Sequence, residues 1–199
     1  MKNVFKITLA ALAVLLVLDQ GTAAQTAATP TGQARQAYGQ MTGHIYTNSV
    51  IGLRIQIPKE MDIDDQSFVD VSLIPTQVPG SMFAGQTLTV KTLFSARAFP
   101  VVFIATATKL PPKLAAKTGE QILNDRLFRE PSAPMAKTEV LGGHTFAYVD
   151  GKTRFNLNRS YAIVLKGYYI SIVFGYKDRG DLDAMRGYLA AANLAWTGK

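Results

Sequence analysis

Residues that commonly carry chemistry are sparse in this chain. The sequence contains two histidines, His44 and His144, and no cysteine. The lack of cysteine excludes disulfides, thiolate catalysis and cysteine-based zinc or iron–sulfur sites. Two histidines cannot form a three-histidine zinc site, and neither belongs to an H-E-x-x-H motif. Each lies at the expected start of a strand, where a structural or exposed histidine is the usual outcome.

Motifs of the common enzyme classes are also missing. There is no Gly-x-Ser-x-Gly elbow, and Gly80-Ser81 lies in a loop with the wrong following residues. No glycine-rich phosphate loop is followed by Lys-Ser/Thr. Gly142-Gly143 leads into a strand rather than a helix, so it does not predict a dinucleotide site. The sequence therefore predicts no catalytic residue and no cofactor.

Carboxylates leave one class of chemistry open. Asp62, Asp64 and Asp65 lack the Gly and the downstream Glu of a calcium loop, so a capped turn is favoured over a metal site. A pair of carboxylates for glycoside cleavage is not excluded, because their separation depends on the fold. No pair is marked by the sequence.

The N-terminus has the pattern of a secretory signal peptide. Lys2 and Lys6 form a positive segment, residues 7–18 are apolar, and small residues follow up to Ala24. We expect cleavage between Ala24 and Gln25, although cleavage after the preceding alanine and an uncleaved anchor remain alternatives. The apolar run is shorter than the ~20 residues of a spanning helix. The predicted protein is exported, to the periplasm or the extracellular space.

Cleavage there leaves a basic protein. Of the 21 Lys and Arg and 14 Asp and Glu residues, the signal segment removes two basic and one acidic residue, so the net charge stays near +6. Nucleic acid is not the expected partner, because the chain is exported and its basic residues are spread. Lys152, Arg154 and Arg159 are the only local concentration, and the Lys113/Lys117 pair is thin. A solvated surface is the simplest interpretation, and weak attraction to an anionic envelope surface is the alternative.

A three-stranded meander is predicted over residues 145–176. Asp150-Gly151 and Lys166-Gly167 predict two-residue hairpin turns, because such turns need positive φ, and a two-residue loop fixes the register. The predicted opposed pairs are Phe146–Phe155 and Tyr148–Thr153 for the first turn, and Leu165–Tyr168, Ile163–Ile170 and Tyr161–Ile172 for the second.

This register predicts one strongly apolar face. It carries Phe146, Tyr148, Phe155, Leu157, Tyr161, Ile163, Leu165, Tyr168, Ile170, Ile172, Phe174 and Tyr176. Arg159 breaks the apolar row. Most of the tyrosines are therefore expected in the core rather than in an aromatic binding surface. Tyr169, on the smaller and mixed face, is the exception.

The remaining elements complete an α+β fold. Strands are predicted near residues 45–46, 53–57, 68–74, 87–94, 101–110 and 137–141. Helices are predicted over 114–129 and, with Asp181 as N-cap, over 181–193. The expected architecture is an antiparallel sheet of about six to seven strands flanked by helices, an α/β/α sandwich. The expected organisation is a signal peptide (1–24), a flexible segment (25–42) and a single domain (43–199).

Two stretches resemble the PsbP-like α/β-sandwich family, which includes photosystem extrinsic subunits and bacterial secreted proteins. They are residues 46–58, a Tyr followed by a Gly-apolar strand that ends in Pro58, and the terminal hairpin and helix, residues 161–194. Met61 stands near the place where that family often has an aromatic. The resemblance covers about a third of the chain. It implies an antiparallel sheet with flanking helices and a non-enzymatic accessory or binding role, and it carries over no functional residue.

The leading functional hypothesis is an exported, non-enzymatic domain that binds an envelope component or protein not identified by the sequence. A small secreted hydrolase around His44 or His144 and a cationic envelope-associated protein are the alternatives. If no helix covers the mixed face of the sheet, the candidate partner surface of the meander is Tyr169, Ser171 and Val164 on that face, with Arg159 in the apolar row.

Overall fold

The computed structural model describes residues 39–64, 70–73, 78–98, 101–125, 127–129, 134–152 and 156–195. The expected signal peptide, its cleavage site at Ala24–Gln25, and Phe155 lie outside these ranges. Across the described residues, no helix is both long enough and apolar enough to cross a membrane.

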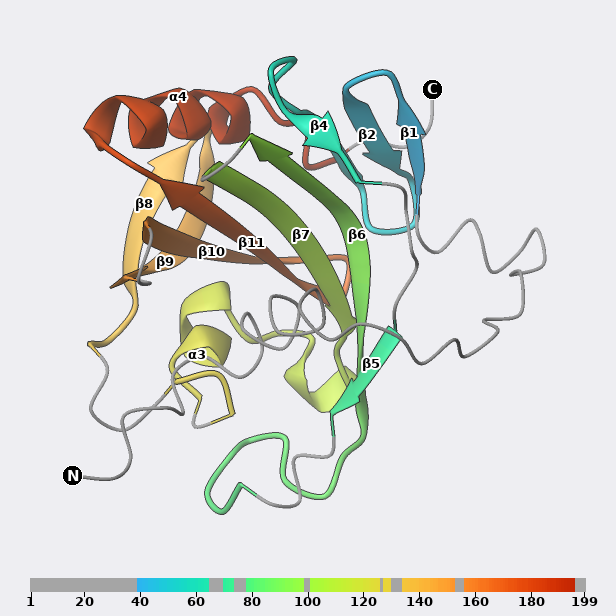
Figure 1. The fold of residues 1–199 in the computed structure, drawn as a ribbon. Helices are drawn as coiled ribbons and strands as arrows, with labels where there is room; N and C mark the ends of the chain where they lie inside the picture. The colour runs from blue at the N-terminus through green and yellow to red at the C-terminus, as the bar shows by residue number, and fades with distance from the viewer. Residues whose placement is uncertain are drawn as a thin grey trace, which may run out of the picture.

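The fold is α+β, and a curved antiparallel sheet dominates it (Figure 1). The strands follow the order β4-β6-β7-β11-β10-β9-β8, and β5 pairs with β6 as well. Their bounds are β4 Asp62–Ile63, β5 Asp70–Leu73, β6 Leu88–Ala98, β7 Val101–Lys109, β8 Lys137–Leu141, β9 His144–Lys152, β10 Leu157–Leu165 and β11 Tyr168–Tyr176. The predicted sheet of six to seven antiparallel strands is thus confirmed in class, with one further short strand.

A separate sheet of three strands is built from β1 (Gln40–Thr42), β2 (Ile45–Asn48) and β3 (Leu53–Gln56). A turn at Asn48 joins β2 to β3, and the Oδ1 of Asn48 accepts hydrogen bonds from the backbone N–H groups of Val50 and Ile51. Such side-chain acceptance substitutes for a backbone turn bond. β1 was not predicted.

The second hairpin of the meander has the predicted register. Leu165 pairs with Tyr168 and Tyr161 with Ile172. Lys166 and Gly167 both have positive φ, 46° and 75°, as a type I′ turn requires.

The turn predicted for the first hairpin is wrong. Asp150 and Gly151 lie inside β9, and Tyr148 pairs with Tyr161 rather than with Thr153. The partner is eight positions further along the chain, an even number, so the same side chains stay on the same face. The longer hairpin places Asp150 opposite Arg159, and the two side chains form an ion pair. This cross-strand pair is available only in the observed register.

The helices differ from prediction in their extent. The C-terminal helix α4 spans Arg179–Ala190, and its N-cap is Asp178, not Asp181. The helix predicted over 114–129 is wrong: a 3₁₀ turn, η2 (Pro112–Leu114), is followed by the short α3 (Gly119–Leu123). Thr118 begins α3 with a capping box, which requires a non-helical residue at that position.

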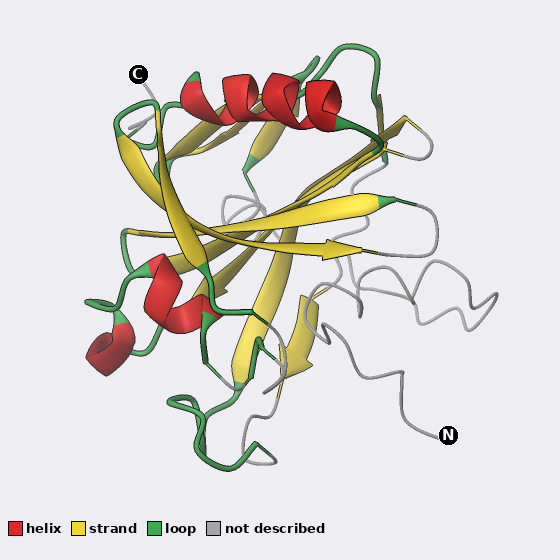
Figure 2. Ribbon diagram, turned by 90° about the vertical axis from the view of Figure 1, so that its left-hand side faces the viewer, coloured by secondary structure: helices red, strands yellow, loops and turns green. Residues whose placement is uncertain are grey.

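The main sheet is covered on both faces (Figure 2). On one face, α4 and the three-stranded sheet pack on the apolar row of the meander. On the other, α3 and the loop before β6 enclose a smaller core. The predicted apolar row is confirmed by the burial of Phe146, Tyr161, Ile163, Ile170, Ile172, Phe174 and Tyr176. Leu157 departs from it, because it is 37% exposed.

Candidate functional site

Three of the four predicted surface residues lie against the smaller core. Tyr169 is 3% exposed, and its ring packs on Phe128 with 5.1 Å between centroids. Val164 packs on the same core, and Ser171 is half-buried and hydrogen-bonded to Tyr169. Burial raises the pKa of the Tyr169 hydroxyl. The condition for a partner surface on this face, that no helix covers it, is not met, because α3 and its neighbouring loop cover Tyr169.

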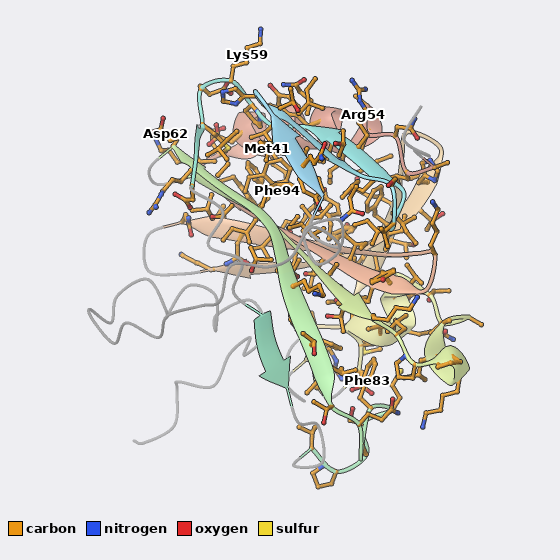
Figure 3. The ribbon with its side chains drawn as sticks, turned by 90° about the vertical axis from the view of Figure 1, so that its right-hand side faces the viewer. Met41, Arg54, Lys59, Asp62, Phe83 and Phe94 are labelled. Carbon is orange, nitrogen blue, oxygen red and sulfur yellow. The ribbon has the colours of Figure 1, made fainter. Side chains whose placement is uncertain are left out.

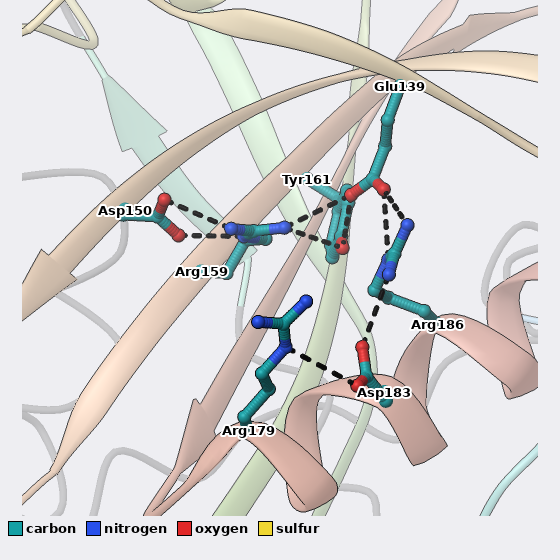
Figure 4. Close-up of polar contacts among 7 residues, drawn as sticks. All are labelled: Glu139, Asp150, Arg159, Tyr161, Arg179, Asp183 and Arg186. Carbon is teal, nitrogen blue, oxygen red and sulfur yellow. Dashed lines mark hydrogen bonds and ion pairs between the residues drawn. The ribbon is translucent and has the colours of Figure 1, made fainter.

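Arg159 lies on the opposite face, within a network of charged side chains between the meander and α4 (Figure 4). We refer to it as the α4 network. Its members are Glu139 on β8, Asp150 on β9, Arg159 and Tyr161 on β10, and Arg179, Asp183 and Arg186 on α4. The structure therefore brings together charged side chains from four elements, and the sequence did not predict these contacts.

Arg159 is held on three sides. Its Nε and Nη2 donate to the two oxygens of Asp150, at 2.7 and 3.0 Å, in the bidentate geometry that matches a guanidinium to a carboxylate. Its Nη1 donates to Glu139 at 3.1 Å. The guanidinium stacks over the ring of Tyr148, 4.0 Å from the centroid. These contacts explain how an arginine occupies a position in an apolar row with only 13% of its side chain exposed.

Glu139 is the centre of the network. Its Oε1 accepts from the Tyr161 hydroxyl at 2.7 Å as well as from Arg159, and its Oε2 accepts from Nε of Arg186 at 2.9 Å. The Glu139 side chain is 15% exposed. Because Arg186 projects from α4 while Glu139 lies on β8, this carboxylate ties the helix to the edge of the sheet.

Two further charges extend the network along α4. Asp183 accepts from Arg186 Nη1 at 3.1 Å, and its second oxygen lies 3.8 Å from Nε of Arg179. Arg179 is 91% exposed, so this last pair contributes little. Three arginines face three carboxylates, and the network is neutral as a whole.

The environment shifts the pKa values of several members. Burial raises the pKa of Tyr161; its hydrogen bond with Arg159 opposes this rise, and its hydrogen bond to Glu139 adds to it. Burial lowers the pKa of Arg159, but its hydrogen bonds to Asp150 and Tyr161 outweigh burial and raise the pKa above its usual value. Hydrogen bonds to Glu139 and Asp183 raise the pKa of Arg186. Each shift favours the charge state that the network uses at neutral pH.

The geometry of the α4 network favours a structural role, in which the network holds α4 on the sheet, over a role in catalysis. Both oxygens of Glu139 and of Asp150 accept hydrogen bonds from arginine nitrogens, and Glu139 also accepts one from the phenol of Tyr161. A general base needs a lone pair directed at a substrate proton. In Glu139 and Asp150 the carboxylate oxygens are directed at guanidinium groups, an arrangement that holds Arg159 and α4 in place.

The two histidines occupy unrelated positions. His44 Nδ1 lies 3.0 Å from the carbonyl oxygen of Pro58, a structural contact that links the start of β2 to the end of β3. His144 opens β9 after the Gly142-Gly143 turn. Across the residues that the structure describes, no three His, Asp or Glu side chains lie close enough to hold a metal ion.

Ser81 and Asp125 form a buried polar pair outside the α4 network, and this pair anchors the loop before β6. The Ser81 hydroxyl donates to Asp125 at 2.5 Å, and the other oxygen of Asp125 accepts from the backbone N–H of Met82 at 2.7 Å. Leu127 N–H also donates to Asp125. Ser81 donates to a carboxylate rather than to a histidine, so it lacks the base that activates a serine nucleophile. The pair instead holds the loop before β6 against the segment that follows α3.

Sequence reasoning found Arg159 but missed Glu139 and Arg186. One signal was present for Glu139: it alternates with Leu141, so a charged residue occupies an inward position of the predicted strand at 137–141. No signal was present for Arg186, because the spacing of apolar residues in α4 does not predict which strand the polar residues of the helix contact.

Comparisons with known proteins add little to this description. No family model matches the sequence, and no curated protein matches it. Among solved structures, a protein from Bacteroides thetaiotaomicron VPI-5482 matches with a TM-score of 0.45 and 11% sequence identity, covering 80% of this chain and 51% of that chain. The chain thus spans about half the length of that protein. A similarity this low carries no argument about function.

Proposed function

We propose that this chain is an exported α+β domain that acts as a non-enzymatic binding or accessory protein in the bacterial envelope or outside the cell. The observation that carries the proposal is the α4 network. Both oxygens of Glu139 and of Asp150 accept hydrogen bonds from arginine, and Glu139 also accepts one from Tyr161. The most organised polar cluster of the described residues therefore serves to fix a helix on a sheet, as expected of a scaffold that presents a surface.

Two features of the sequence support the same proposal. The segment up to Ala24 has the charge, apolar core and small residues of a signal peptide. The stretches 46–58 and 161–194 resemble the PsbP-like family, whose members have accessory and binding roles. Export and membership of that family's bacterial secreted branch are parts of the proposal.

Export is tested by expressing the full chain in a bacterial host, fractionating the cells and sequencing the N-terminus of the exported protein. The expected N-terminus is Gln25, in the periplasm or medium. A protein that starts at Met1 and stays in the cytoplasm contradicts the proposal.

The non-enzymatic part is tested with the purified mature chain against ester, amide and glycoside substrates. We expect no turnover above buffer. A hydrolytic activity that disappears in the His44→Gln/His144→Gln double variant, while the variant keeps the wild-type circular dichroism spectrum, contradicts it and supports a secreted hydrolase.

A specific observation favours one form of binding over others. Three lysines of the segment 109–117 and the distant Lys166 lie on segments that a backbone hydrogen bond joins, and they form no ion pair with a described carboxylate. This arrangement supports association with an anionic envelope surface as the second candidate function.

A further inference from the structure

Three segments far apart in the sequence meet at one side of the molecule (Figure 3). They are the β2–β3 turn at 49–52, the segment 109–117 after β7, and the β10–β11 turn at 166–167. The N–H of Leu110 donates to the carbonyl of Gly167 at 2.9 Å, and Lys166 Nζ donates to the carbonyl of Ser49 at 3.1 Å. These bonds fix the three segments against one another.

Two of these segments, 109–117 and 166–167, carry four lysines between them, which we call the lysine patch. Its members are Lys109, Lys113, Lys117 and Lys166. All are exposed except Lys117, which is half-buried. Within the described part of the chain, no ion pair joins any of them to a carboxylate. Glu120 is the one acidic residue of α3, the helix that follows the segment 109–117. The patch therefore keeps a clear positive excess.

The conformation of Lys166 is a second, independent observation. Among the described residues it is the one non-glycine residue with positive φ. Glycine and asparagine adopt this conformation at lower cost, and they are the usual residues at this place in a type I′ turn. A lysine held there directs its ammonium group at the β2–β3 turn, where Nζ donates to the carbonyl of Ser49.

Apolar and aromatic groups border the lysines. Val50, at the tip of the β2–β3 turn, is 41% exposed and follows Ser49, the residue that Lys166 contacts. Lys109 Nζ lies 4.3 Å from the centroid of the Tyr168 ring. Lysines around a small apolar tip match the boundary of a bilayer, where the cations meet headgroups and the apolar group enters the interface.

We propose that the lysine patch docks the exported protein on a bilayer rich in anionic phospholipid. The inference rests on the proposed export, because it assigns the protein to a compartment that such a bilayer bounds. A bilayer is favoured over a soluble polyanion because the exposed Val50 gains nothing from a polymer of phosphates or uronates. Four lysines near an anionic surface together strengthen binding by on the order of 100-fold or more.

The test uses the mature chain, residues 25–199, with phosphatidylglycerol-containing vesicles and with pure phosphatidylcholine vesicles in a co-sedimentation assay. Wild type is expected to bind only the anionic vesicles, and added salt is expected to weaken binding. A variant with Lys109→Gln, Lys113→Gln, Lys117→Gln and Lys166→Gln is expected to bind about 100-fold more weakly.

The matched control removes the same charge elsewhere, at four exposed lysines outside the patch. It carries Lys59→Gln, Lys137→Gln, Lys152→Gln and Lys177→Gln. We expect it to lose less than about threefold, because those lysines lie outside the patch segments: after β3, in β8, in β9 and before α4. Val50→Asn is expected to weaken vesicle binding and to leave binding to soluble polyphosphate unchanged.

Three outcomes overturn the proposal: no binding of wild type to anionic vesicles, an equal loss in the two quadruple variants, or patch-dependent binding to polyphosphate without binding to vesicles. None of these outcomes bears on export, which the N-terminal sequence decides separately. Circular dichroism of each variant establishes that the fold is kept.

Discussion

The α4 network and the lysine patch use charge in opposite ways. In the network, three arginines and three carboxylates neutralise each other at the junction of β8, β9, β10 and α4. In the patch, four lysines at the end of β7, in the segment after it and in the β10–β11 turn form no ion pair with a described carboxylate. Paired charges favour one arrangement of the fold, whereas cations without a carboxylate partner remain available to an anionic surface.

Residue type follows this division. The network uses arginine, whose planar fork matches carboxylates and stacks on Tyr148. The patch uses lysine, a compact charge on a flexible stem that adapts to a diffuse anionic surface. The comparison thus predicts that network variants change stability and that patch variants change binding.

Glu139→Gln is expected to have the largest effect on stability. The change leaves Arg159 and Arg186 without their shared carboxylate at a largely buried position, so we expect the free energy of unfolding to fall by roughly 2–4 kcal/mol. Urea unfolding of the mature chain at neutral pH measures it.

Glu60→Gln is the control for that change, because Glu60 is exposed and forms no ion pair with a described residue. We expect a change of about 0.5 kcal/mol or less. Equal effects of the two variants would mean that the network does not stabilise the fold.

Tyr161→Phe is expected to have a smaller and pH-dependent effect. The loss of the hydrogen bond to Glu139 lowers the free energy of unfolding by about 1 kcal/mol at neutral pH. Because the pKa of Tyr161 is raised in the folded state, its contribution is complete below the unfolded pKa of ~10 and is lost as pH rises through the folded pKa.

Wild type should therefore lose more stability than Tyr161→Phe between neutral pH and pH ~11. Urea unfolding of both proteins at the two pH values measures this difference. Lysine titration affects both proteins alike and cancels. A constant difference across the range would show that Tyr161 titrates normally.

The quadruple lysine variant of the patch is expected to have the smallest effect on stability. Its four side chains are exposed or half-buried, and the one hydrogen bond lost is that of Lys166 to the Ser49 carbonyl. We expect the free energy of unfolding to change by about 0.5 kcal/mol or less. A loss comparable with that of Glu139→Gln would remove the contrast between the two regions.

The meander shows which features of a hairpin a local sequence pattern can predict. Lys166-Gly167 predicted both its turn and its register, because the two-residue turn was correct. Asp150-Gly151 predicted the wrong turn, because the chain instead extends β9 and pairs Asp150 with Arg159. The apolar face was still correct, since an even shift in register preserves alternation.

The segment after β7 shows where tertiary contacts override a local pattern. Its apolar spacing predicted one helix over 114–129, but Asn124 and Asp125 use their side chains to accept bonds from the backbone N–H groups of Ala136 and Met82. α3 ends at Leu123, immediately before these residues. Partners this distant in sequence are not visible in a helical pattern.

The charged regions were the least predictable part of the molecule. Arg159 stood out because it interrupts an apolar row, whereas its partner Glu139 and the helix residue Arg186 meet only in the folded chain. Lys113 and Lys117 alone did not predict a basic patch, for the same reason. Lys166 joins them and Lys109 only when the β10–β11 turn meets the segment after β7. Arg154, which had marked a local basic cluster, lies outside the described residues.

Hydrogen exchange measured by mass spectrometry, with and without anionic vesicles, tests both regions of the mature chain at once. The account predicts slower exchange on vesicle addition in segments 49–52, 109–117 and 166–168. It predicts no change in segments 137–141, 157–161 and 179–186, where the charges already satisfy one another. Protection confined to the α4 network, with the lysine patch unchanged, would contradict it.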